Sequence, residues 1–147
     1  MHLSLSSSDE SGWLSTRKKP MTFDRFILAF AATGLIPIAL TYGIRPVTVL
    51  TALYGFDVVG INEPNIFRAV MGLYFGQIIF WYMGFAKDEL RRPALYMMAT
   101  FMLGLAAGRV LSLVIDGVAN WLLLLYLFLE ALLGTLAVSA LRRTVDG

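Results

Sequence analysis

The chain of 147 residues lacks cysteine altogether and contains one histidine, His2, in a polar first segment. Without cysteine, the sequence has neither a disulfide framework nor a thiolate metal site. A single histidine excludes multi-histidine metal sites, histidine general bases in the hydrophobic region and Ser/His triads, unless a partner supplies the residue. We therefore expect no metal and no cofactor, and an enzymatic role is the less favoured interpretation.

Charged residues are also scarce. They make up 15% of the chain, whereas hydrophobic residues make up 58%. The mean hydropathy of +0.71 is too high for a soluble domain of this length. At about 20 residues per membrane crossing, the chain has room for four spans. The bilayer is thus the expected surrounding, and the placement of the basic residues argues against a nucleic-acid partner.

The apolar residues form four long runs, which predict an all-α membrane four-helix bundle. Residues 1–24 are predicted to be a polar, flexible cytoplasmic tail without a cleavable signal peptide. Residues 25–143 are predicted to form the membrane domain. The expected spans are Phe26–Ile44, Ile66–Phe85, Pro93–Ile115 and Asn120–Leu141.

The connections between these spans are short. Residues 46–56 are apolar but too short to cross a membrane, so they predict an interfacial or re-entrant helix that Gly55 closes. Asn62 or Asn65 is a candidate cap for the helix that follows. Residues 87–92 are charged and predict a turn between the second and third spans.

Basic residues are concentrated on one side of the predicted bundle. The opposite side carries only Arg45 outside the hydrophobic segments. Because Lys and Arg are enriched in cytoplasmic loops, the bias predicts cytoplasmic termini in a bacterial inner membrane. The residues on the cytoplasmic side are Arg17, Lys18, Lys19, Arg25, Lys87, Arg91, Arg92, Arg142 and Arg143.

A few polar residues interrupt the apolar spans. A charge at the centre of a membrane helix costs about 2.5–3.5 kcal/mol on insertion scales, so such residues pair or have a function. The structural interpretation pairs Arg109 with Glu130, and Arg68 with Asp116 or with loop carbonyls. The predicted intramembrane polar network comprises Arg68, Arg109, Ser112, Asp116 and Glu130.

Glu130 is the deepest of these carboxylates, about 15 Å into its span at 1.5 Å per residue. We expect it to be ionised, to face the bundle interior and to contact Arg109, or otherwise Arg68. The alternative interpretation is a proton or ligand site centred on Glu130, with Gln77 and Tyr126 as polar neighbours.

The second and third spans both contain a GxxxG motif, Gly72 with Gly76 and Gly104 with Gly108. This spacing places both glycines on one helix face, where helix backbones can approach closely. We predict that the two spans pack against each other within the subunit through these glycines. Dimerisation through one of these faces is the alternative.

Several runs of the chain resemble the bacterial membrane family catalogued as domain of unknown function 4345. The resemblance covers about residues 25–142 and implies a four-span fold without a known activity. The runs that carry it are Leu53–Gly55, Asn65–Gly76, Arg91–Leu95, Gly104–Gly117 and Glu130.

Three functions fit these features. The favoured one is a non-catalytic accessory or scaffold subunit that packs against a larger membrane complex or a second copy. One alternative is a small carrier or a lipid- or quinone-binding protein that uses the membrane carboxylate of Glu130. The other is a lipid- or quinone-processing enzyme with Glu130 or Asp116 as its acid or base. An open cavity at Glu130 would favour the latter two, and a dry Arg–Glu contact the first.

Overall fold

The computed structural model describes residues 21–55 and 57–143, so residues 1–20 of the predicted tail lie outside the described part. The described residues form five α-helices and no strand. Four helices are long and apolar enough to cross a membrane, which confirms the predicted all-α architecture. The helices are α1 (Phe23–Gly43), α2 (Pro46–Tyr54), α3 (Asn62–Ala86), α4 (Asp88–Ile115) and α5 (Trp121–Arg143).

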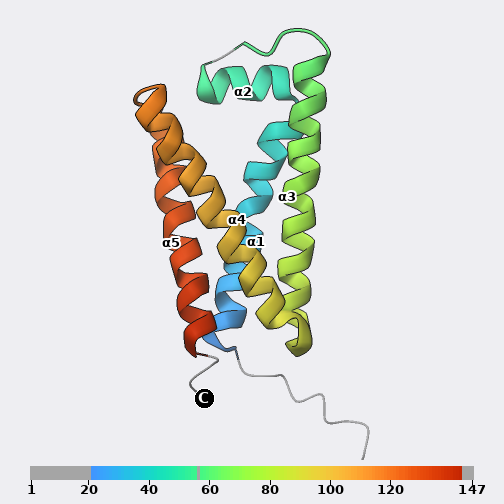
Figure 1. The fold of residues 1–147 in the computed structure, drawn as a ribbon. Coiled ribbons are helices and arrows are strands. Elements are labelled where there is room, and N and C mark those ends of the chain that lie inside the picture. The colour runs from blue at the N-terminus through green and yellow to red at the C-terminus, as the bar shows by residue number, and fades with distance from the viewer. Residues whose placement is uncertain (1–20, 56, 144–147) are drawn as a thin grey trace, which may run out of the picture.

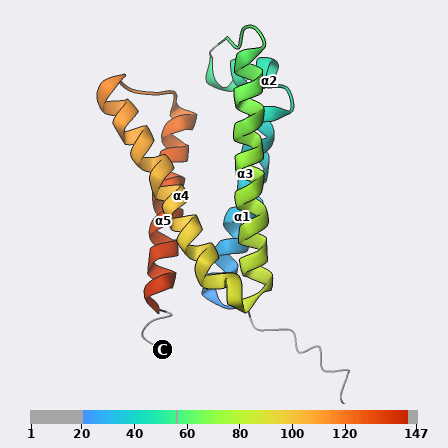
Figure 2. The same ribbon diagram turned by 45° about the vertical axis from the view of Figure 1, so that its right-hand side comes forward.

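The long helices are arranged as two pairs. Helix α1 packs along α3, and α4 packs along α5, with much smaller contacts between α1 and either α4 or α5. Figure 2 shows that the pairs meet where α3 passes into α4 and diverge toward the other end. We call the end at Lys87 the closed end, and the end with α2 and the turn of residues 116–120 the open end. The start of α1 and the end of α5 also lie at the closed end (Figure 1).

Small residues explain why the closed end is tightly packed. A Cβ added to Gly84 on α3 would collide with the Cβ of Ala94 on α4 and would lie 3.3 Å from Leu28 Cδ1 on α1. Ala94 and Leu28 are fully buried, and so is Trp81, one turn before Gly84. The missing side chain therefore lets α3 and α4 approach closely, beside a core formed by three helices.

Helix α4 begins earlier than predicted. It starts at Asp88, whereas the expected start was Pro93, so only Lys87 separates it from α3. Two acidic residues, Asp88 and Glu89, occupy the first turn, where a negative charge is favoured by the helix dipole. Pro93 lacks one backbone N–H, but the helix continues through it. The predicted charged turn of residues 87–92 is therefore mostly helix.

Helix α2 crosses the open end of the α1/α3 pair (Figure 1). It ends at Gly55 as predicted, because Gly55 has a φ of 74°, a left-handed conformation that glycine adopts readily. The predicted cap of α3 is wrong. The residue that precedes the helix is Ile61, and no side chain, neither that of Asn62 nor that of Asn65, caps it.

The prediction that the GxxxG glycines pack inside the subunit is also wrong. The four glycines are Gly72, Gly76, Gly104 and Gly108. All four are exposed, and an added Cβ at each would meet no described atom within 4 Å. Close α4–α5 packing instead occurs at Gly134, which lies against Leu103. The spacing correctly identifies two glycine-bearing helix faces. The divergence of the two helix pairs leaves the α4 face uncovered, whereas the α3 face lies on the opposite side of α3 from the buried Tyr74 and Trp81.

Candidate functional site

The predicted contact between Arg109 and Glu130 is present in the structure. Arg109 Nε of α4 donates a hydrogen bond to Glu130 Oε2 of α5 at 2.8 Å. The two side chains are 21% and 10% exposed, so the ion pair is largely withdrawn from the surroundings. Glu130 faces the bundle interior as expected. Opposite charges at hydrogen-bond distance are the arrangement that makes charge burial tolerable.

Tyr126 completes the surroundings of the guanidinium. It lies one turn before Glu130 on α5, so both side chains lie on the same helix face. The Arg109 guanidinium carbon lies 5.6 Å from the centre of the Tyr126 ring, within cation–π range. The sequence interpretation named Tyr126 as a neighbour of Glu130, and the structure places it against the charge that neutralises Glu130.

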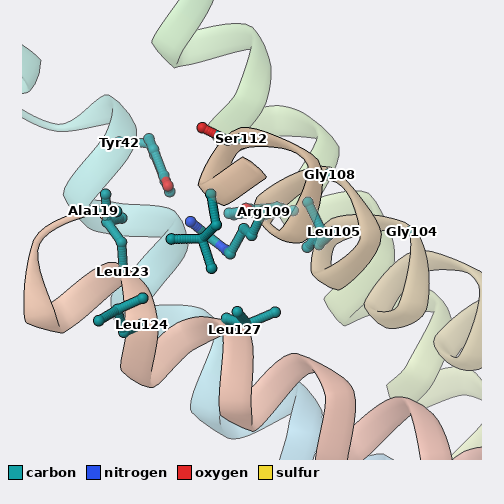
Figure 3. Close-up of a pocket in the computed structure, with 12 residues that line it drawn as sticks. Tyr42, Gly104, Leu105, Gly108, Arg109, Ser112, Ala119, Leu123, Leu124 and Leu127 are labelled. Carbon is teal, nitrogen blue, oxygen red and sulfur yellow. The ribbon is translucent and has the colours of Figure 1, made fainter. Parts of the chain in front are cut away.

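A cavity of about 360 Å³ lies beside this pair, between the two helix pairs. Its polar lining comes from Arg109 and Ser112 of α4, Tyr42 of α1 and Tyr74 of α3. Its apolar lining includes leucines of α5. Figure 3 shows Arg109 between Tyr42 and the α5 leucines Leu123, Leu124 and Leu127. The cavity therefore combines hydrogen-bonding groups with an apolar wall, at the depth of the membrane-spanning helices.

A second cavity of about 140 Å³ adjoins the first, since Tyr74 and Leu105 line both. Its lining is almost entirely apolar, and Glu130 is the one charged residue in it. Arg109 borders the larger cavity and Glu130 the smaller one. The ion pair thus lies where a polar compartment and an apolar compartment meet.

The α4 glycines help to form the larger cavity. Gly104 and Gly108 line it, and their missing side chains leave space beside Arg109. The predicted packing residues are therefore part of the cavity wall.

Sequence reasoning missed the two lining tyrosines. Tyr42 and Tyr74 lie on different helices with ring centres 5.5 Å apart, so no spacing within one helix could connect them. Tyr54 of α2 extends this aromatic group, with its ring centre 6.3 Å from that of Tyr42. Burial is the main reason that the pKa of Tyr54 rises to about 12. A tyrosine hydroxyl is protonated at neutral pH even at its ordinary pKa of about 10, so Tyr54 can serve as a hydrogen-bond donor.

The predicted polar network is not continuous. Ser112 Oγ donates to Asp116 Oδ2 at 2.8 Å, on the exposed end of α4. Arg68 is exposed on α3 and forms no ion pair with any residue in 21–55 or 57–143. The predicted Arg68–Asp116 contact is therefore wrong. The helix pairs diverge at the open end, which separates the start of α3 from the end of α4.

Gln77 was predicted to be a polar neighbour of Glu130, but it lines neither cavity. It is buried on α3, and its Oε1 has no hydrogen-bond partner among the described residues. Among those same residues, no group of three or more His, Cys, Asp or Glu side chains is arranged to hold a metal ion.

Comparison with known protein families identifies a match. The model of the family described as "Domain of unknown function (DUF4345)" matches residues 23–141, which is most of the chain. No curated protein and no solved structure matches the chain.

Proposed function

We propose that this chain, which belongs to the DUF4345 family, is a multi-pass membrane protein that binds an uncharged, lipid-like amphiphile between its two helix pairs. The observation that carries the proposal is the position of the Arg109–Glu130 pair between a polar and an apolar cavity. Binding sites for small molecules are typically concave, mostly apolar and equipped with a few convergent polar groups.

The ion pair selects the chemical class of the head group. Arg109 donates to Glu130 through Nε, and its side chain also interacts with Tyr42, so the remaining guanidinium N–H groups can donate to a ligand. Glu130 already neutralises the arginine charge, so an anionic head group would leave an excess negative charge in a largely apolar site. Carbonyl or ether oxygens, as in a quinone or a glyceride, accept hydrogen bonds without this cost.

The smaller cavity supports the apolar part of such a ligand. Phe30, Leu35, Met102 and Leu133 contribute to its lining from three different helices. A molecule whose head contacts Arg109 would extend its chain past Tyr74 into this compartment. Burial of the chain would supply affinity, and the polar groups would supply orientation.

A binding assay with matched probes tests this function. A decyl-substituted benzoquinone and decyl phosphate share the same chain and differ in head-group charge. We expect the quinone, and not the phosphate, to raise the Tm of the detergent-solubilised protein. Gly108→Leu would fill the larger cavity and should abolish the shift. Gly76→Leu, on an exposed face away from both cavities, is the control and should retain it. Equal shifts of the Tm by the quinone in both variants would exclude the larger cavity as the binding site.

We also propose that the closed end faces the cytoplasm of a bacterium. Support comes from the bias of lysine and arginine, because Lys87, Arg91 and Arg92 lie at the same end as Arg142 and Arg143. Cysteines introduced at Ser7 and Asn62 should react with a membrane-impermeant reagent from opposite sides of the membrane. Labelling of both from one side would refute this topology.

A role as an accessory or scaffold subunit is a second candidate, with one observation in its favour. Gly72 and Gly76 of α3 form a GxxxG face that no described atom covers. Such a face suits a helix of a larger complex or of a second copy. If this role is correct, Gly72→Leu should disrupt a complex isolated from native membranes, while Gly104→Leu should leave it intact. If the complex persists in both variants, docking through α3 is refuted.

A further inference from the structure

A third cavity, which we call the groove, lies between α4 and α5. It is on a different face of α4 from the larger cavity described above. Its volume is about 520 Å³, and its lining includes Ala99 and Leu103 of α4 and Val138 of α5. Tyr96 also contributes to the lining and is 53% exposed. None of these four residues lines either of the two cavities described above. The groove is therefore independent of the proposed ligand site, and its apolar lining suits a hydrocarbon chain.

One end of this groove carries a positive charge. Arg142 lines it, is exposed, and forms no ion pair with another residue of the described part. It lies in the last turn of α5, at the closed end, where the helix dipole also favours a cation. Val138 lies one turn earlier, about 6 Å deeper along the axis. The groove thus has a cationic end at the membrane boundary and an apolar interior.

The neighbouring arginine differs from Arg142 in its contacts. The guanidinium carbon of Arg143 lies 4.9 Å from the centre of the Phe23 ring, so this side chain is directed toward α1. Arg142 has no such contact with a ring of the described residues, and it lines the groove. Basic residues also outnumber acidic ones among the described residues of the closed end, which attracts anionic head groups.

We propose that this groove binds an anionic phospholipid from the leaflet at the closed end. The phosphate lies against Arg142, and one acyl chain lies along Ala99, Leu103 and Val138. The charge complementarity selects this occupant, because basic pockets between membrane helices suit acidic head groups. A partner helix seated in the same groove would instead cover Arg142 without supplying a counter-charge.

Native mass spectrometry of the full chain, reconstituted with equal amounts of phosphatidylglycerol and phosphatidylcholine, tests the proposal. The wild type should retain phosphatidylglycerol at least fivefold more often than phosphatidylcholine. Arg142→Gln should remove this preference. Arg92→Gln makes the same change of charge at an exposed residue of the closed end that does not line the groove, and it should keep the preference.

A second variant separates the groove from the charge. Val138→Phe fills the groove without altering any charge, and it should lower retention of phosphatidylglycerol severalfold. Equal losses in Arg142→Gln and Arg92→Gln would overturn the proposal, because they would indicate attraction to the whole surface. A wild type without lipid preference would also overturn it. So would a dimer that Val138→Phe dissociates, because a second copy would then occupy the groove.

Discussion

The two ends of the bundle handle charge and space in opposite ways. At the closed end, Trp81 and Leu28 are fully buried, and the charges lie at the boundary, where Arg25 Nη2 contacts Asp88 Oδ1 at 2.8 Å. Toward the open end the helix pairs separate, two cavities remain, and the ion pair of Arg109 with Glu130 lies within the spans. The tightly packed region therefore has its polar groups at the periphery, while the loosely packed region holds them inside.

Two glycines illustrate the difference in packing between the closed and the open end. Gly84 and Gly108 both lie in long apolar helices. A Cβ added to Gly84 would overlap Ala94 of the next helix, whereas a Cβ added to Gly108 would have no atom of residues 21–55 or 57–143 from another part of the fold within 4 Å. The same missing side chain permits close helix contact at one end and creates cavity volume at the other. The role of a glycine in this bundle is thus set by the distance to the neighbouring helix.

The largest expected effect on the free energy of unfolding comes from breaking the buried ion pair of Arg109 and Glu130. Glu130→Leu should lower the free energy of unfolding in detergent by roughly 3–5 kcal/mol, because it leaves Arg109 buried without a counter-charge. The measurement is an equilibrium unfolding titration of the purified protein.

The double variant with Arg109→Leu is the control. It should recover much of the lost stability, since no uncompensated charge remains. Stability close to that of the wild type in Glu130→Leu alone would show that the pair does not support the fold.

The two glycines provide the next test. Gly84→Leu should destabilise the protein by about 1–3 kcal/mol, because the new side chain overlaps Ala94 at the closed end. Gly108→Leu should change stability by less than ~0.5 kcal/mol, since its side chain enters open space. Both substitutions change helix propensity alike, so the difference reports packing. Equal destabilisation by Gly84→Leu and Gly108→Leu would mean that the larger cavity is closed in solution.

A smaller effect is expected for the boundary charges. Asp88 contacts both Arg25, which is 8% exposed, and Arg91. Asp88→Asn should lower stability by about 1 kcal/mol, because the Asp88 side chain is 47% exposed and the pair is partly screened. Thermal unfolding at low and at high salt would check this. A loss comparable with that of Glu130→Leu would contradict the contrast between the two ends.

The smallest effect concerns Asn120 at the open end. Its Oδ1 accepts a hydrogen bond from the backbone N–H of Leu122 at 3.0 Å, and its Nδ2 donates to the carbonyl of Leu53 at 3.4 Å. Asn120→Ala should cost ~0.5 kcal/mol through the lost cap of α5, and Asn120→Ser should recover this loss in chemical denaturation. Failure of serine to recover it would indicate that the link to Leu53 is the more important contact.

The helices of this fold follow from local sequence patterns. Four apolar runs of membrane length form four helices because a backbone in hydrocarbon must satisfy its hydrogen bonds internally. Gly55 ends α2 for a local conformational reason. The Arg109–Glu130 contact was also predictable, since two opposite charges at similar depth in an apolar surrounding stabilise each other.

The divergence of the two helix pairs arises from tertiary packing, and so do the features that depend on this divergence. The GxxxG spacing marks a helix face but does not specify what covers it, so Gly104 and Gly108 line a cavity where close packing was predicted. The same divergence separates Arg68 from Asp116. Tyr42 joins the cavity from another helix for a related reason, because contacts between distant segments arise from helix packing and have no pattern within any single segment.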